Sequence, residues 1–259
     1  MRLDVTLLPR VLRRPETSVC LLIDALRASS SIATLFAQGA EEVVVAGSTA
    51  AARRIAAEEP GRYLLCGEVG GLAPRGFDYG NSPSEFASLD MRGRRIVLST
   101  TNGTKALRAL TASPVVLVGA LLNATAAVTT LLAEARALRI DATLVCAGLE
   151  QGNAFSLEDA FVAGALVEAA VEQTRSPSGD LSLSDAAMAA CRLYQSYQSD
   201  ALACFREAEH GRSLTGVGLE RDLEFCARVD RCDVVPRLRG DESGRLTLVV
   251  EKASGRRKR

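Results

Sequence analysis

Short apolar runs alternate with segments of helical pattern along the first 150 residues. Uninterrupted runs of Val, Leu and Ile are typical of strands that are covered on both faces, so their alternation with helices predicts a parallel or mixed sheet. The expected fold class is therefore α/β, with three layers in the order α/β/α. The strands are expected at residues 18–23, 43–45, 63–66, 96–98, 115–118 and 142–145, and the helices at 29–38, 49–58, 104–110 and from 125 onward.

Helical patterns dominate after residue 155. Residues 157–173 are expected to form a long helix with Ser156 as its N-cap. Residues 183–210 follow as one or two helices, which places His210 at a helix C-terminus. Residues 176–180 are expected to form a loop, and the apolar runs 234–238 and 246–250 a terminal hairpin.

Charge and composition exclude several classes of protein. The chain has 31 basic and 31 acidic side chains, no Trp and 4% aromatic residues, so neither a basic surface nor base stacking is expected, and no nucleic-acid partner. Its single histidine excludes phosphatase chemistry that needs two histidines. Seven cysteines, an odd number without close pairs, predict reduced thiols and a cytoplasmic location. The uncharged residues 111–133 have membrane-span length, but Pro114, Gly119 and Asn123 divide them, so no membrane span is expected.

Polar residues follow four of the expected strands, at the strand ends where α/β sheets bind ligands. Asp24, Arg27 and Ser29 follow the first strand. Asp24 can hold a divalent cation, and the fork of donors on Arg27 can bind a phosphate or sulfonate. The alternative is that Asp24 only caps the next helix and pairs with Arg27.

The second segment is a glycine-rich loop after residues 63–66. It has five glycines within residues 67–80, together with the acids Glu68, Asp78 and Glu85. Glycines let the backbone approach a ligand closely, and the carboxylates suit a cation. A surface loop with ordinary turn chemistry is the alternative interpretation.

The third segment, residues 99–105, runs from the end of a strand into a helix. Its amides predict an anion site, although the pattern is not that of a P-loop; the alternative is a well-capped helix start. The fourth segment contains Cys146, Glu158 and Asp159, and Asn123 is expected at the same rim. Glu158 and Asp159 equally suit a metal role or compensation of the helix dipole.

Asp222 and Cys226 lie four residues apart on one helix face. On this spacing Asp222 is interpreted as a solvated or capping residue, since most acids are exposed. Cys226 is interpreted as a core residue rather than a nucleophile.

Taken together, these motifs resemble those of the 2-phosphosulfolactate phosphatase family. They occur in family order from about residue 18 to 236. The matching segments are residues 23–30, 67–68, 76–83, 99–104, 123–124, 146–148, 155–159, 222–230 and 235–236.

The resemblance implies a magnesium-dependent phosphatase that converts 2-phospho-3-sulfolactate to 3-sulfolactate and phosphate, a step toward coenzyme M. It also implies a three-layer α/β/α fold in one domain over residues 1–259, with similar halves at about 1–120 and 121–259. The residues themselves predict a basic tail at 253–259. Two alternatives stay open. The chain can be a phosphatase of another small anionic phosphoester, or a small-anion binding protein without catalysis. A homodimer is expected from the frequency of dimers among cytoplasmic enzymes.

A mechanistic hypothesis assigns roles to these residues. Mg²⁺ would be held by Asp24, Glu68 and Asp78. The nucleophile is left open between water, a carboxylate and the thiol of Cys146. The residues assigned to catalysis are Asp24, Arg27, Cys146 and Glu158; those assigned to substrate binding are Ser29, Asn81, Thr100, Thr101, Asn102, Gly103, Thr104, Lys105 and Asn123.

Overall fold

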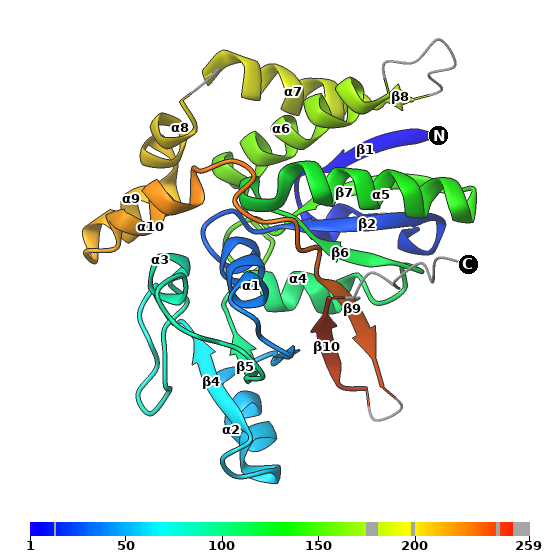
Figure 1. The fold of residues 1–259 in the computed structure, drawn as a ribbon. Coiled ribbons are helices and arrows are strands. Elements are labelled where there is room, and N and C mark those ends of the chain that lie inside the picture. The colour runs from blue at the N-terminus through cyan, green and yellow to red at the C-terminus, as the bar shows by residue number, and fades with distance from the viewer. Residues whose placement is uncertain (13, 175–180, 198–199, 242–243, 251–259) are drawn as a thin grey trace, which may run out of the picture.

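A computed structural model describes residues 1–12, 14–174, 181–197, 200–241 and 244–250 (Figure 1). The described strands form one sheet in the order β4-β5-β3-β10-β9-β6-β2-β7-β1-β8. The expected loop at 176–180 and the basic tail at 253–259 lie outside the described residues. The strands are β1 (Arg2–Thr6), β2 (Ser18–Ile23), β3 (Glu42–Val45), β4 (Tyr63–Gly67), β5 (Arg95–Ser99), β6 (Val116–Val118), β7 (Asp141–Cys146), β8 (Ser182–Leu183), β9 (Arg237–Gly240) and β10 (Leu246–Val249).

The helices cover both faces of this sheet, and most begin within a residue or two of the predicted position. Ser156 caps α6 as expected, because its side chain accepts a hydrogen bond from the amide of Asp159. The helices are α1 (Ala28–Ala37), α2 (Thr49–Glu58), α3 (Pro83–Phe86), α4 (Gly103–Ala109), α5 (Ala124–Leu138), α6 (Leu157–Gln173), α7 (Asp185–Tyr197), α8 (Ala201–Glu207), α9 (Glu209–Gly216) and α10 (Glu220–Cys226).

Strand β2 shows how the three layers form. All six of its residues are buried, and they alternate between the two faces of the sheet. Leu21 and Ile23 pack in a cluster with residues of α5 and α6, whereas Cys20 and Leu22 pack in another cluster with residues of α1 and α4. The three-layer α/β/α prediction is therefore confirmed.

The sheet is mixed because of the terminal hairpin. Strand β10 pairs antiparallel with β3 and with β9, and β9 pairs antiparallel with β6. The remaining pairs are parallel. The expected boundary near residue 120 does not divide the sheet, since β1 and β2 from the first half both pair with β7 from the second.

The uncharged stretch 111–133 contains β6 and the first part of α5, in agreement with the sequence analysis. Among the described residues, no helix combines the length and the apolar character that crossing a membrane requires.

Candidate active site

A cavity of about 250 Å³ lies where the carboxyl ends of two parallel strand pairs, β2 with β7 and β4 with β5, meet. Its wall consists of residues that follow β2, β4, β5 and β7, together with Asn81 and part of α9. Figure 1 shows α9 and α10 beyond the carboxyl end of β2. The structure therefore has a cavity at the strand ends where the sequence predicted the site.

Asp24 follows β2 directly and is 7% exposed. Its Oδ1 accepts a hydrogen bond from the amide of Ala28 at 3.1 Å, so it does cap α1 while it lines the cavity. Burial raises the pKa of Asp24 to about 6, and the nearby carboxylate of Glu68 adds to this rise. Gly103 allows this packing, because a Cβ on it would lie 2.6 Å from Asp24 Oδ2.

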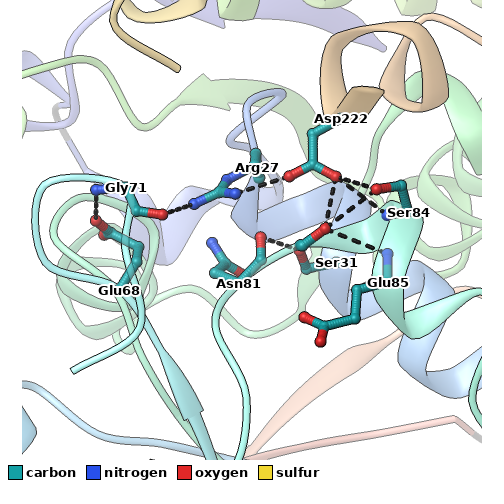
Figure 2. A network of polar contacts seen from close by, with 9 residues as sticks. Arg27, Ser31, Glu68, Gly71, Asn81, Ser84, Glu85 and Asp222 are labelled. Carbon is teal, nitrogen blue, oxygen red and sulfur yellow. Dashed lines mark hydrogen bonds and ion pairs between the residues drawn. The ribbon is translucent and has the colours of Figure 1, made fainter. Parts of the chain in front are cut away.

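Arg27 lies in the cavity wall and is held from both sides, as Figure 2 shows. Its Nη1 donates to Asp222 Oδ2 at 2.7 Å, and its Nη2 donates to the carbonyl of Gly71 at 2.6 Å. A guanidinium carries five N–H groups, so these two bonds leave others that can bind a molecule in the cavity. The suggested pair of Asp24 with Arg27 is replaced by a pair with Asp222.

Asp222 is fully buried, which corrects its interpretation as a solvated or capping residue. Its Oδ1 accepts hydrogen bonds from the hydroxyls of Ser82 at 2.7 Å and Ser84 at 2.6 Å (Figure 2). The same carboxylate therefore joins α10, the 82–84 segment and Arg27. Sequence spacing could not show this, because the partners lie more than 130 residues away along the chain.

Glu68 joins the two loops that follow β4 and β5. Its Oε2 accepts from the amide of Gly71 at 3.0 Å, and its Oε1 accepts from the amide of Thr101 at 2.6 Å. One amide of the predicted anion site in residues 99–105 therefore donates to a carboxylate of the protein instead of to a ligand. Thr100, Thr101 and Asn102 nevertheless line the cavity as predicted.

Asn81 lines the cavity and is 2% exposed. Its backbone carbonyl accepts from the hydroxyl of Ser31 at 3.1 Å, whereas its side-chain Oδ1 has no hydrogen-bond partner. A buried amide oxygen without a partner costs free energy, and no group of the described residues satisfies this one. The prediction that Asn81 contacts a ligand is consistent with this geometry.

The predicted three-carboxylate metal site is not formed. Asp78 is exposed, does not line the cavity, and accepts a hydrogen bond from the amide of Leu65 at 2.7 Å. Within the described part of the chain, no group of three His, Cys, Asp or Glu side chains is placed to hold a metal ion. Asp24 and Glu68, with Asn81 in the same wall, still fit Mg²⁺, which is commonly bound by one or two carboxylates with waters and phosphate oxygens.

Cys146 does not line the cavity, in contrast to its prediction as a nucleophile. The side chain is fully buried at the end of β7 within the core. Burial raises the pKa of this thiol well above its usual value, so the reactive thiolate is not formed near neutral pH. The nucleophiles still open are therefore water and a carboxylate.

Several predicted substrate contacts are instead structural. Ser29 Oγ accepts from the amide of Asp24 and donates to the carbonyl of Leu22. Asn123 is fully buried and bonds the backbone at Ala120, Val118 and Val234. These side chains are saturated by backbone groups, which explains why polar residues stand at these strand ends without reaching a ligand.

The remaining members of the 99–105 segment lie outside the cavity wall. Thr104 is buried, and its amide donates to the hydroxyl of Thr100 at 3.2 Å. Gly103 supplies close packing against Asp24, and Lys105 lies on α4 away from the lining. The assignment of Lys105 to substrate binding is not supported by this position.

Two carboxyl groups at the start of α6 lie behind the cavity. Asp159 accepts from the amides of Ala25 at 2.8 Å and Gly148 at 3.0 Å, so it fixes the chain just after β2 and β7 relative to each other. Glu158 is 1% exposed, and burial raises its pKa to about 7. Both groups do more than compensate the helix dipole, but neither lines the cavity.

The sequence analysis missed the contribution of α9. Glu209 and His210 line the cavity, and His210 is the second residue of α9 rather than a C-terminal residue. Glu150, in the turn after β7, lines it too. No local motif marks these positions, because they reach the cavity only when α9 folds back over the strand ends.

The charges around the cavity are mostly negative. Asp24, Glu68, Glu150 and Glu209 contribute carboxyl groups, whereas Arg27 is the one guanidinium of the lining and is already paired with Asp222. A multiply charged anion would be repelled by these carboxylates at such short range. The cavity thus favours an anion that binds together with a cation.

Comparison with known proteins gives a consistent family. The family model described as 2-phosphosulpholactate phosphatase matches residues 7–241. A protein of Synechococcus sp. strain JA-2-3B'a(2-13), named probable 2-phosphosulfolactate phosphatase, is 42% identical over 226 residues, which are 86% of this chain and 88% of that protein. Proteins with the same name from Thermosynechococcus vestitus and Carboxydothermus hydrogenoformans are 38% and 35% identical, over 86% and 96% of this chain and 89% and 97% of their own lengths.

Proposed function

Because this chain belongs to the 2-phosphosulfolactate phosphatase family, we propose that it hydrolyses 2-phospho-3-sulfolactate to 3-sulfolactate and inorganic phosphate. The observation that carries this proposal is the cavity, which is lined by the buried Arg27, by the carboxyl groups of Asp24 and Glu68 and by Asn81. Such an arrangement suits a phosphate ester that binds with a divalent cation.

Arg27 is the residue expected to bind the phosphoryl group. Its two bonds to Asp222 and Gly71 fix the plane of the guanidinium before substrate arrives. The N–H groups that remain can donate to two phosphoryl oxygens, which is a geometry that arginine provides and lysine does not. Preorganised donors of this kind stabilise the charge that develops during phosphoryl transfer.

Asp24, Glu68 and Asn81 are the residues that would hold Mg²⁺. A bound Mg²⁺ supplies neutralisation of the phosphoryl charge, which the acidic lining otherwise opposes. Both oxygens of Glu68 are fixed by amides, and Asp24 is fixed by its cap on α1, so their positions need little rearrangement.

Water is the nucleophile that we propose. Asp24 and Glu68 are assigned to Mg²⁺, and Asp24 Oδ1 is also held by the amide of Ala28, so an attack of either carboxylate on phosphorus would compete with these roles. A single turnover in heavy-oxygen water tests this point. The label should appear in the released phosphate, whereas label found in the enzyme would contradict direct attack by water.

The proposed activity is tested by phosphate release from a panel of phosphorylated hydroxy acids under Mg²⁺ titration. Asp24→Asn should lower kcat/KM by about 10²-fold or more and weaken Mg²⁺ binding measured by calorimetry. Asp78→Asn is the matched control, because Asp78 lies outside the cavity and asparagine can still accept from Leu65. Thermal stabilisation by panel members without any phosphate release would favour an anion-binding protein instead.

The sequence-based expectations of a homodimer, a cytoplasmic location and a step toward coenzyme M stay predictions. Hydrolysis of 2-phospholactate at the rate of the sulfonated ester would favour a phosphatase of another small anionic ester.

A further inference from the structure

His210 is the single histidine of the chain, and it lines the cavity beside Arg27, Asp24 and Glu68. The roles assigned above neutralise charge and position the phosphoryl group, but none of them supplies a proton to the leaving oxygen. Histidine is the side chain whose ordinary pKa lies closest to neutrality, so its presence in this wall calls for a chemical explanation.

Helix α9 places His210 in the cavity wall. The loop after β2 that carries Asp24, Leu26 and Arg27 lines the same cavity. The residue after His210, Gly211, allows α9 to pack closely, since a Cβ there would lie 1.7 Å from the carbonyl oxygen of Phe205. Because His210 lines the cavity, its imidazole can bond a molecule bound there.

The charges that face His210 change when substrate binds. Burial lowers the pKa of His210, Arg27 acts in the same direction, and Glu68 and Glu209 act against it. Asp24 and Glu150 also line the cavity. A bound ester with phosphate, carboxylate and sulfonate groups carries more negative charge than one Mg²⁺ ion neutralises, so binding of both favours the protonated ring.

We propose that His210 is the general acid of the reaction and protonates the ester oxygen as it leaves phosphorus. This inference rests on the proposed function. The bond between phosphorus and the ester oxygen breaks, its electron pair stays on that oxygen, and the oxygen takes the proton of the imidazolium. The oxygen of water forms the new bond to phosphorus. One proton of that water stays on the phosphate and the other is released to solvent, from which His210 takes up a proton again, so the net reaction consumes only water.

The leaving group decides how much this proton matters. The hydroxyl oxygen of sulfolactate is an aliphatic alkoxide when it leaves, and an alkoxide is a poor leaving group without a proton. A nitrophenolate leaves readily without one. General acid catalysis is worth typically 10²–10⁴-fold, and it should be lost only with the first kind of ester.

The test compares kcat/KM of the wild type and His210→Gln on three esters: 2-phospho-3-sulfolactate, 2-phospholactate and 4-nitrophenyl phosphate. We expect a loss of about 10²-fold or more on the two alkyl esters and less than about 10-fold on the aryl ester. The alkaline limb of the wild-type pH profile on alkyl esters should also be absent in the variant. Equal losses on alkyl and aryl esters, or no loss on either, would overturn the proposal.

The use of 2-phospholactate separates this inference from the proposed function. A wild type that does not prefer the sulfonated ester refutes the proposed substrate, yet the comparison of alkyl and aryl esters still measures the role of His210. Arg221→Gln, an exposed change on the neighbouring α10, is the matched control and should leave the ratio of alkyl to aryl rates unchanged.

A second measurement does not depend on turnover. Because the chain has one histidine, protein labelled with ¹⁵N-histidine gives a single imidazole whose pKa can be followed by NMR. The pKa should lie below its ordinary value in the free protein and rise when inorganic phosphate and 3-sulfolactate are added together. A pKa that the two anions leave unchanged would place the ring away from the substrate and contradict its role.

Discussion

Replacing Asp222 by Asn should destabilise the fold by leaving the guanidinium of Arg27 buried without a counter-charge. The side chains of Arg27 and Asp222 are 2% and 0% exposed and lie 2.7 Å apart. Breaking a buried ion pair by removing one partner typically costs about 3–5 kcal/mol, because the remaining charge is not solvated. The amide of the new asparagine would also point a donor at Arg27 or at the serine hydroxyls that Asp222 now accepts from.

Urea unfolding followed by circular dichroism measures this change as a shift of the midpoint, with the slope m compared between the proteins. The exposed pair of Arg92 with Asp90, at 2.6 Å, provides the control. Asp90→Asn should not shift the midpoint measurably, although its ion pair is equally short, because solvent screens exposed charges. An Asp222→Asn midpoint equal to that of the wild type would refute the argument from burial.

The double variant Arg27→Met, Asp222→Leu separates stability from activity. Replacing a buried pair by apolar side chains is often neutral for stability, so the double variant should unfold closer to the wild type than Asp222→Asn does. Its phosphatase activity should still be lost, because no guanidinium remains in the cavity wall.

Three further outcomes follow from the packing around the cavity. The pKa of Glu158 is raised from 4.5 to about 7, so the folded protein holds a proton that the unfolded chain releases, and this contribution to stability falls as pH rises from about 4.5 to about 7. In the wild type, the free energy of unfolding should fall by an amount on the order of 2–3 kcal/mol between the two ends of this pH range, and in Glu158→Gln this fall should be absent. Urea unfolding at both pH values measures it. The same pH dependence in both proteins would contradict the assignment to Glu158. Gly103→Ala should destabilise the folded protein by about 1–3 kcal/mol and lower its activity, because the new Cβ would clash with Asp24 Oδ2 and with the Cβ of Ala28. Gly47→Ala is the control and should be tolerated, because a Cβ on Gly47 would lie 3.5 Å from the nearest side-chain atom of Arg108. Asn123→Ala should lower the free energy of unfolding by about 2–3 kcal/mol with little change in kcat, and a selective loss of kcat would restore its predicted role in substrate binding.

The fold could be predicted largely from local pattern. The runs at 18–23 and 142–145 are mostly apolar and rich in Val, Leu and Ile, which is typical of strands buried on both faces. They became β2 and β7, which pair along their length. Strand β1 was missed because Asp4 interrupts its short apolar run, and β1 is identified only by its pairing with β7.

The insertion of the hairpin between β3 and β6 was also not visible in the sequence. Residues 234–238 and 246–250 predicted two paired strands, but a hairpin's own pattern does not state which sheet edge it joins. In the structure β10 pairs with β3 and β9 pairs with β6. The hairpin therefore joins two groups of strands into one sheet, and it covers the edges that β3 and β6 would otherwise expose.

Local sequence determined which strand ends carry polar residues, because a buried strand must be followed by groups that satisfy the helix start and the turn after it. That rule placed Asp24, Glu68 and residues 100–102 at the cavity, but it also selected Ser29 and Asn123, whose polar atoms satisfy backbone instead. The tertiary structure alone decided that Asp222 meets Arg27 and that His210 reaches the same space. Both lie on short helices that fold back over the strand ends, and a contact between residues so far apart in the chain depends on packing that no local pattern encodes.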